Sequence, residues 1–77
     1  MKDVTNILKS VQASATFWGA TIVQCTGKRN TVQVEFSNVS DTDNIRKAFR
    51  ACGMITKQDG CVLLIRYPST SERNRMQ

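Results

Sequence analysis

Two similar twelve-residue segments recur along the chain, and this repetition restricts the possible folds more than any other feature. The segments are residues 3–14 and 41–52, which are identical at five of twelve positions when aligned at an offset of 38 residues. In both segments, apolar residues recur at the spacing that places them on one face of a helix. The two apolar stripes are Val4, Ile7, Leu8 and Val11, and Ile45, Ala48, Phe49 and Cys52. Each segment is therefore predicted to form an amphipathic helix.

Residues that typically begin and end helices flank both segments. Asp3 is the expected N-cap of the first helix, because its carboxylate can accept hydrogen bonds from unpaired backbone N–H groups. The polar run 40–43 supplies N-cap candidates for the second helix, and Gly53 follows its last turn. These signals predict that the second helix starts within this polar run and ends just before the glycine.

Each predicted helix is followed by two stretches that are typical of a β-hairpin. The first pair is residues 20–25 and 31–36, joined by a turn at 27–30, and the second pair is 54–57 and 61–67, joined at 58–60. The second strand alternates, with Val32, Val34 and Phe36 on one face, which indicates a half-buried strand. The last strand is apolar almost throughout, so it is expected in the centre of the sheet, ending at Pro68.

The repeated helix–strand–strand order predicts the fold. One such unit cannot bury its apolar face alone, so the two units are expected to share one core. The predicted fold is α+β with the order αββαββ: a four-stranded, mostly antiparallel sheet with both helices packed on one face. The 77 residues are enough for one small domain. Residues 1–68 are predicted to form it, and residues 69–77 to form a flexible basic tail.

The residue types present exclude several classes of site. The chain has no histidine, and its three cysteines, Cys25, Cys52 and Cys61, lack Cys-x-x-Cys spacing. Imidazole catalysis, Ser-His-Asp triads and the common zinc sites are therefore excluded within one chain. We predict a non-enzymatic protein with reduced thiols and no metal or cofactor. No apolar stretch reaches the ~18–20 residues of a membrane span and no signal peptide is recognised, so we expect a cytoplasmic protein without a membrane partner.

The formal net charge of +5 favours polyanionic partners. The basic side chains expected to contact nucleic acid lie in the first turn, on the outer face of the second helix and in the third strand. They are Lys28, Arg29, Arg46, Lys47, Arg50 and Lys57. The alternative is an ordinary solvated surface, since helix exteriors and turns are usually charged and no aromatic residues are interleaved to stack on bases.

A protein–protein interface is also compatible with the sequence. Phe17 is expected to close one end of the core, whereas Trp18 fits either the core or an exposed contact. Because the helices cover one sheet face, part of the apolar run 62–65 is expected to face outward. Trp18, Leu63 and Ile65 are the candidate partner interface, and a homodimer through this face is one form that it could take.

Cys25 ends the first predicted strand, just before two basic residues that would stabilise a thiolate or an attached anion. The order helix, strand, cysteine, strand, helix, hairpin resembles the IIB domain of the glucose-type phosphotransferase system. Residues 39–53 also look like that family's second-helix segment, which ends in small residues and glycine. The resemblance implies an antiparallel sheet backed by helices and a phosphocysteine at Cys25. The family follows its cysteine with Thr-Arg-Leu-Arg, where this chain has Thr-Gly-Lys-Arg.

These features lead us to expect a small, basic, non-enzymatic binding module of a regulatory or mobile-element kind. Its expected partner is nucleic acid or a protein that handles nucleic acid, because the charge balance favours polyanions and no catalytic set of residues is present. Two alternatives stay open. One is a IIB-like cysteine phosphocarrier that acts through Cys25, and the other is a protein-binding inhibitor or adaptor that uses an exposed sheet face.

Overall fold

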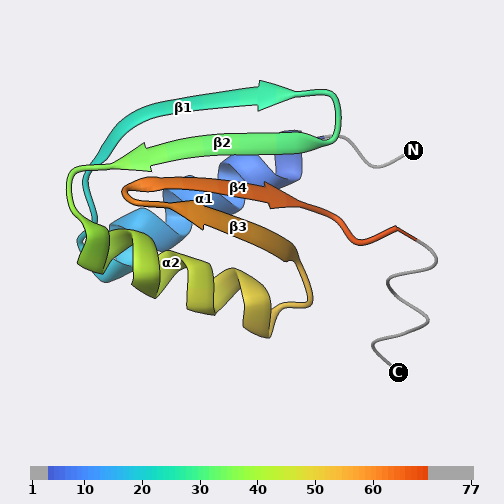
Figure 1. Ribbon diagram of the computed structural model, residues 1–77. Helices are drawn as coiled ribbons and strands as arrows, with labels where there is room; N and C mark the ends of the chain where they lie inside the picture. Colours follow the sequence, from blue (N-terminus) through green and yellow to red (C-terminus); the bar gives the residue numbers. More distant parts are fainter. Residues whose placement is uncertain (1–3, 70–77) are drawn as a thin grey trace.

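A computed structural model describes residues 4–69 and confirms the αββαββ order in that range (Figure 1). The elements are α1 (Thr5–Trp18), β1 (Ile22–Lys28), β2 (Thr31–Phe36), α2 (Val39–Ala51), β3 (Ile55–Asp59) and β4 (Val62–Arg66). The expected N-cap Asp3 and nearly all of the expected tail, residues 70–77, lie outside the described residues.

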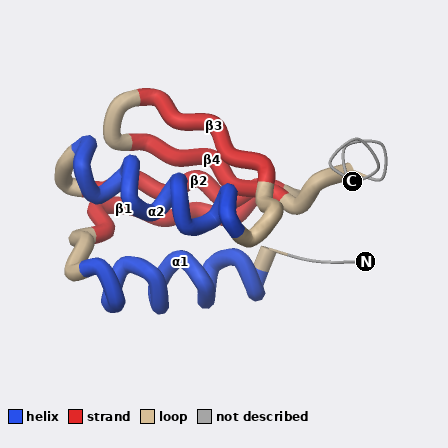
Figure 2. The backbone as a smooth tube through the Cα atoms, turned by 90° about the horizontal axis from the view of Figure 1, so that it is seen from below, coloured by secondary structure: helices blue, strands red, loops and turns tan. Residues whose placement is uncertain are grey.

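The strands form one antiparallel sheet in the order β1-β2-β4-β3. The apolar strand β4 is central, as predicted, and it pairs with β2 in the middle of the sheet. Each hairpin therefore contributes one inner and one outer strand, which gives the two helix–hairpin units an approximately twofold arrangement. Both helices lie on the same face of the sheet, below it in Figure 1, and Figure 2 shows them from that side.

The core lies between this sheet face and the two helices. Its buried apolar residues are Ile7, Val11, Ala15, Val32, Val34, Phe36, Ile45, Phe49, Leu63 and Ile65. The repeat offset of 38 residues aligns Ile7 with Ile45 and Val11 with Phe49, and all four side chains are buried. Fully burying a side chain of this size contributes about 1.5–3 kcal/mol. The repeated segments thus supply equivalent core contacts from the two helices.

Asn38 caps α2, so this helix begins before the polar run 40–43 that was predicted to start it. The Asn38 side-chain oxygen accepts a hydrogen bond from the backbone N–H of Asp41 at 2.8 Å. Thr42 is fully buried, and its hydroxyl lies 3.0 Å from the carbonyl oxygen of Asn38 and 3.2 Å from that of Cys61. This second contact ties the start of α2 to the β3–β4 turn.

β1 extends further than predicted, and the glycine expected in the first turn lies inside the strand. The turn comes after Lys28, where Arg29 adopts a positive φ of 48°. A Cβ atom added at Gly27 would lie 2.9 Å from Val4 Cγ2 and 3.4 Å from Leu8 Cδ1. The glycine is therefore needed because α1 packs closely against β1, not because the chain turns there.

The second hairpin is shifted by one or two residues relative to its predicted limits. β3 continues to Asp59, which pairs with Val62, so the turn consists of Gly60 and Cys61. Gly60 has a φ of 61°, which glycine adopts without strain. Gly53, with a φ of 84°, follows the end of α2 as predicted.

Candidate functional site

Three rows of cross-strand neighbours cover the sheet face opposite the helices. The rows are Lys28–Thr31–Arg66–Ile55, Thr26–Gln33–Leu64–Lys57 and Gln24–Glu35–Val62–Asp59. Side chains of directly paired residues point to the same side of a sheet. Their neighbours along β2 and β4, including Val34 and Leu63, are fully buried against the helices. The residues in these rows therefore point away from the core.

Basic side chains occupy the two rows nearest the β1–β2 turn. These rows contain Lys28, Lys57 and Arg66 and no acidic residue, whereas the third row contains Glu35 and Asp59. The exposed side chain of Arg29 adjoins the first row at the turn. We call Lys28, Arg29, Lys57 and Arg66 the basic face. These side chains span the sheet from β1 to β3, and a phosphate group on this face would meet cations without a carboxylate in the same rows.

Arg66 belongs to the basic face but was not among the predicted site residues. It ends an apolar run, so the alternation that turns its side chain outward was not visible in the sequence. Its Nη1 donates a hydrogen bond to the carbonyl oxygen of Tyr67 at 3.2 Å, which restricts the guanidinium. Beside it lies a shallow concavity of about 240 Å³, lined by Thr31, Ile55, Thr56, Lys57, Leu64 and Arg66.

The basic residues of α2 do not join the basic face, because α2 lies on the opposite side of the sheet (Figure 2). Arg46 Nε donates to the side-chain oxygen of Gln58 at 2.7 Å, and its Nη2 lies 3.9 Å from an Asp43 oxygen. Lys47 and Arg50 are exposed on the outer side of the helix. The six predicted nucleic-acid contacts are thus divided between two surfaces, and Arg46 is partly engaged within the domain.

The prediction that Phe17 closes the core is wrong. Phe17 is 81% exposed and Trp18 is 49% exposed, at the last turn of α1. Ala15 occupies the core-facing position there, and a residue two positions later points about 200° away around a helix. The two rings pack edge to face, with centroids 5.5 Å apart and an interplanar angle of 83°. Trp18 was predicted to lie either in the core or in an exposed partner contact, and its exposure is compatible with the partner contact.

Leu63 and Ile65 cannot form the predicted partner interface. Both are 0% exposed, because in the register with β2 they face the helices. Val62 and Leu64 are the apolar residues of β4 that face outward, and both are half-buried. The outward surface of β4 is therefore narrower and less apolar than expected.

Cys25 lies within β1 rather than at its end. It pairs with the buried Val34, packs against the core and is half-buried. Burial raises the pKa of the Cys25 thiol, because a thiolate loses hydration there. A raised pKa disfavours the thiolate that a nucleophilic or phosphoryl-accepting cysteine requires.

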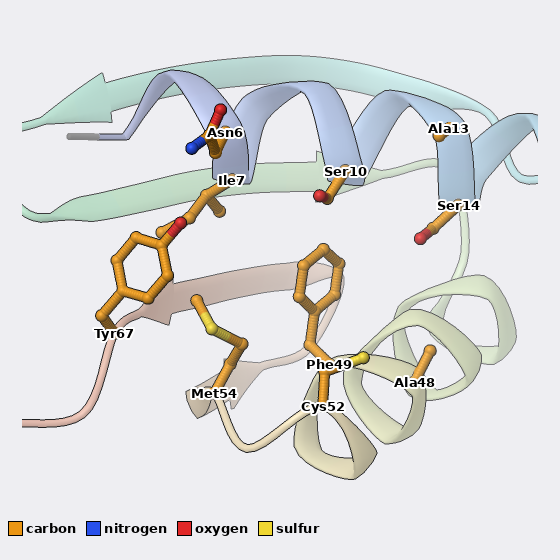
Figure 3. A pocket seen from close by; sticks show the side chains of 10 residues that line it. All are labelled: Asn6, Ile7, Ser10, Ala13, Ser14, Ala48, Phe49, Cys52, Met54 and Tyr67. Atoms are coloured by element: carbon orange, nitrogen blue, oxygen red, sulfur yellow. The ribbon is translucent and has the colours of Figure 1, made fainter. Parts of the chain in front are cut away.

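A groove of about 380 Å³ runs between α1 and α2 on the helix side of the molecule (Figure 3). It is lined by Asn6, Ile7, Ser10, Ala13, Ser14, Ala48, Phe49, Cys52, Met54 and Tyr67. Phe49 and Met54 point toward α1, whose polar side chains form the facing edge. No acid–base pair lines this groove, and residues 4–69 contain no group of three or more potential metal ligands.

No protein-family model, curated protein or solved structure matches the chain. Among the described residues, no helix is both long enough and apolar enough to cross a membrane. The candidate site therefore rests on the geometry of the sheet face and on the distribution of charge over it.

Proposed function

We propose that the protein is a non-enzymatic regulatory module that binds the phosphate backbone of nucleic acid through its basic face. The observation that supports this best is the pairing of the strands. It brings Lys28, Lys57 and Arg66 into two adjacent rows without a carboxylate, and Arg29 extends them at the turn. Contacts to phosphate from such side chains are electrostatic and largely independent of nucleotide sequence.

The size of the basic face sets the expected salt dependence. If all four basic side chains contact duplex phosphates, log affinity falls with log salt at a slope of about −3.6, taking about 0.9 per contact. Affinity then drops on the order of 100-fold between 50 and 200 mM salt. Such binding is strong enough to measure at low salt and weak at physiological salt.

Double-stranded nucleic acid suits this face better than single strands. Proteins that bind single strands stack bases on aromatic side chains, at about 1–3 kcal/mol per base. The three outward-facing rows contain no aromatic residue: Phe36 and Phe49 are buried, and Phe17 and Trp18 lie at the end of α1. We therefore expect single strands to bind no more tightly than a duplex of the same length.

Two triple variants with the same change in net charge test the proposal. The face variant is Lys28→Gln, Arg29→Gln and Lys57→Gln, and the control is Lys9→Gln, Lys47→Gln and Arg50→Gln. All six side chains are exposed, so neither variant opens a cavity in the core. Fluorescence anisotropy with a labelled duplex, repeated over a salt series, gives the affinity and its slope for each protein.

For the face variant, the slope of log affinity against log salt should flatten by about 0.9 for each of the three lost contacts. This variant should also bind at least tenfold more weakly at 50 mM salt. The control should keep nearly the wild-type slope. Equal losses in both variants would mean that net charge alone drives binding. Wild-type protein that fails to bind any duplex at 50 mM salt would overturn the proposal.

The phosphocarrier alternative gains no support from the position of Cys25. The side chain faces the helices, on the opposite side of the sheet from the neighbouring Lys28, and burial raises the pKa of its thiol. The protein-binding alternative has a specific observation in its favour, the exposed aromatic pair at the end of α1.

A further inference from the structure

Four large apolar residues are exposed on segments that meet at the end of the molecule opposite the β1–β2 turn. They are Phe17, Trp18, Val23 and Val39, with exposed fractions of 81%, 49%, 60% and 49%, and we call them the aromatic end. Phe17 and Trp18 contact each other through their rings. Figure 1 shows that α1 ends, β1 and α2 begin and β2 ends at this side of the molecule. A backbone hydrogen bond of 3.0 Å from Ser37 to Thr21 holds these segments together. An exposed pair of aromatic rings such as Phe17 and Trp18 is a feature that often marks a protein interaction site.

The acidic residues that the structure describes lie toward the same end, and one of them, Asp43, is 3.9 Å from Arg46. All four acidic residues in the described part of the chain lie near the start of α2 or the β3–β4 turn: Glu35, Asp41, Asp43 and Asp59. The contact between Thr42 and the carbonyl oxygen of Cys61 joins these two places. Two copies that met through their aromatic ends would bring these acids face to face. The charge therefore disfavours a symmetric pairing of this end with itself.

The complementary surface is the basic face at the other end of the same molecule. There Lys57 and Arg66 border the shallow concavity of about 240 Å³, and Ile55 and Leu64 contribute apolar lining. This surface offers cations to an acidic partner and apolar area to an aromatic side chain. The two ends thus differ in charge, and each carries apolar side chains.

We propose that the aromatic end of one copy docks on the basic face of a second copy, so that the protein associates head to tail. Such a contact joins two different surfaces, so a dimer still has one free aromatic end and one free basic face. Further copies can therefore add to it unless the copies close into a ring. The inference goes beyond the proposed function and does not depend on it. Because both use the basic face, nucleic acid should compete with self-association.

Sedimentation velocity on nucleic-acid-free protein tests this directly. Phe17→Ser disables the aromatic end without touching the core, because this side chain is mostly exposed. Lys28→Glu with Lys57→Glu reverses two charges on the basic face. The matched controls are Gln12→Ser, on the exposed side of α1, and Lys9→Glu with Lys47→Glu, on the exposed sides of the two helices.

The wild-type average mass should rise with concentration up to about 1 mM and pass that of a dimer. Each disabled variant should associate roughly 30-fold more weakly, while both controls behave like the wild type. An equimolar mixture of the two disabled variants should form a one-to-one dimer, because each keeps the surface that the other lacks.

Three results would overturn the proposal. One is a wild-type protein that stays monomeric over this range, and another is a mixture of disabled variants that fails to form the dimer. The third is a discrete wild-type dimer that Phe17→Ser abolishes and the charge reversal leaves intact, since that pattern describes a symmetric contact.

Discussion

At the scale of single residues, the direction of each strand side chain decides which charges lie together. Lys57 points outward into the basic face, whereas the next residue, Gln58, points toward the helices and accepts a hydrogen bond from Arg46 at 2.7 Å. A register slip of one residue would exchange these directions. The pairing of Lys57 with Leu64 is therefore as important to the site as the charge itself.

Thiol reactivity should separate the cysteines according to their surroundings. Cys52 is exposed, whereas Cys25 is half-buried and burial raises the pKa of its thiol. Since the thiolate is the reactive species, we expect Cys25 to react with iodoacetamide roughly an order of magnitude more slowly than Cys52 at pH 7.5. Peptide mass mapping during the reaction measures both rates.

The pH dependence of folding follows from the same shift. The folded state keeps the Cys25 proton at pH values where the unfolded chain has lost it, so it binds more protons in that range. This contribution to stability is fully present at pH values below the pKa of Cys25 in the unfolded chain. It is lost as the pH rises through the pKa of Cys25 in the folded protein. In the alkylation experiment at pH 7.5, a Cys25 that reacts before Cys52 would show that its thiol is not buried in this way.

At the level of the elements, helix periodicity predicted most of the buried faces. Cys52, which was placed in the apolar stripe of the second helix, is instead exposed, because α2 ends at Ala51 and Cys52 lies beyond its last turn. Ile7, Val11, Ile45 and Phe49 all face the core as expected. The start of α2 was not predictable in the same way, because several capping residues follow one another from Asn38 onward. The cap that forms is the one compatible with the tertiary contact between Thr42 and the β3–β4 turn.

The candidate site was predictable only where the residues sit in turns or alternating strands. Lys28 and Lys57 were identified as site residues from the sequence, and both lie on the basic face. In β4 no polar residue interrupts the apolar run before Arg66, so the sequence does not indicate which residues face inward. Pairing with β2 decides this: it buries Leu63 and turns Arg66 outward. That pairing is a long-range contact, which local patterns do not reveal.

Phe49 should be the most sensitive position of α2 for stability. It is 6% exposed and belongs to the core beneath the sheet. Phe49→Ala should lower the free energy of unfolding by roughly 3–5 kcal/mol. Small domains have about 5–15 kcal/mol in total, so urea denaturation should show a much earlier midpoint. The neighbouring Arg50→Ala, at an exposed position, should change stability by less than about 0.5 kcal/mol. A loss under about 1 kcal/mol for Phe49→Ala would contradict the packing of α2.

At the scale of the whole molecule, charge and exposed hydrophobic area are separated along the long direction of the sheet. The β1–β2 turn and the end of β4 carry Arg29 and Arg66, while Glu35 and Asp59 lie toward the other end, near the β3–β4 turn. Four of the eight basic residues between positions 4 and 69 thus lie together on one side of the sheet. This separation orients the molecule in the field of a polyanion.

The proposed function requires that nucleic acid bind the basic face and not the helix surface. An NMR titration of ¹⁵N-labelled protein with a short duplex at low salt tests it most directly. We expect the backbone amide signals of the basic face (Lys28, Arg29, Lys57 and Arg66) to shift progressively. Those of Lys47 and Arg50, on the outer side of α2, should stay in place. Shifts that are confined to α2, or that spread evenly over both sides of the domain, would contradict it.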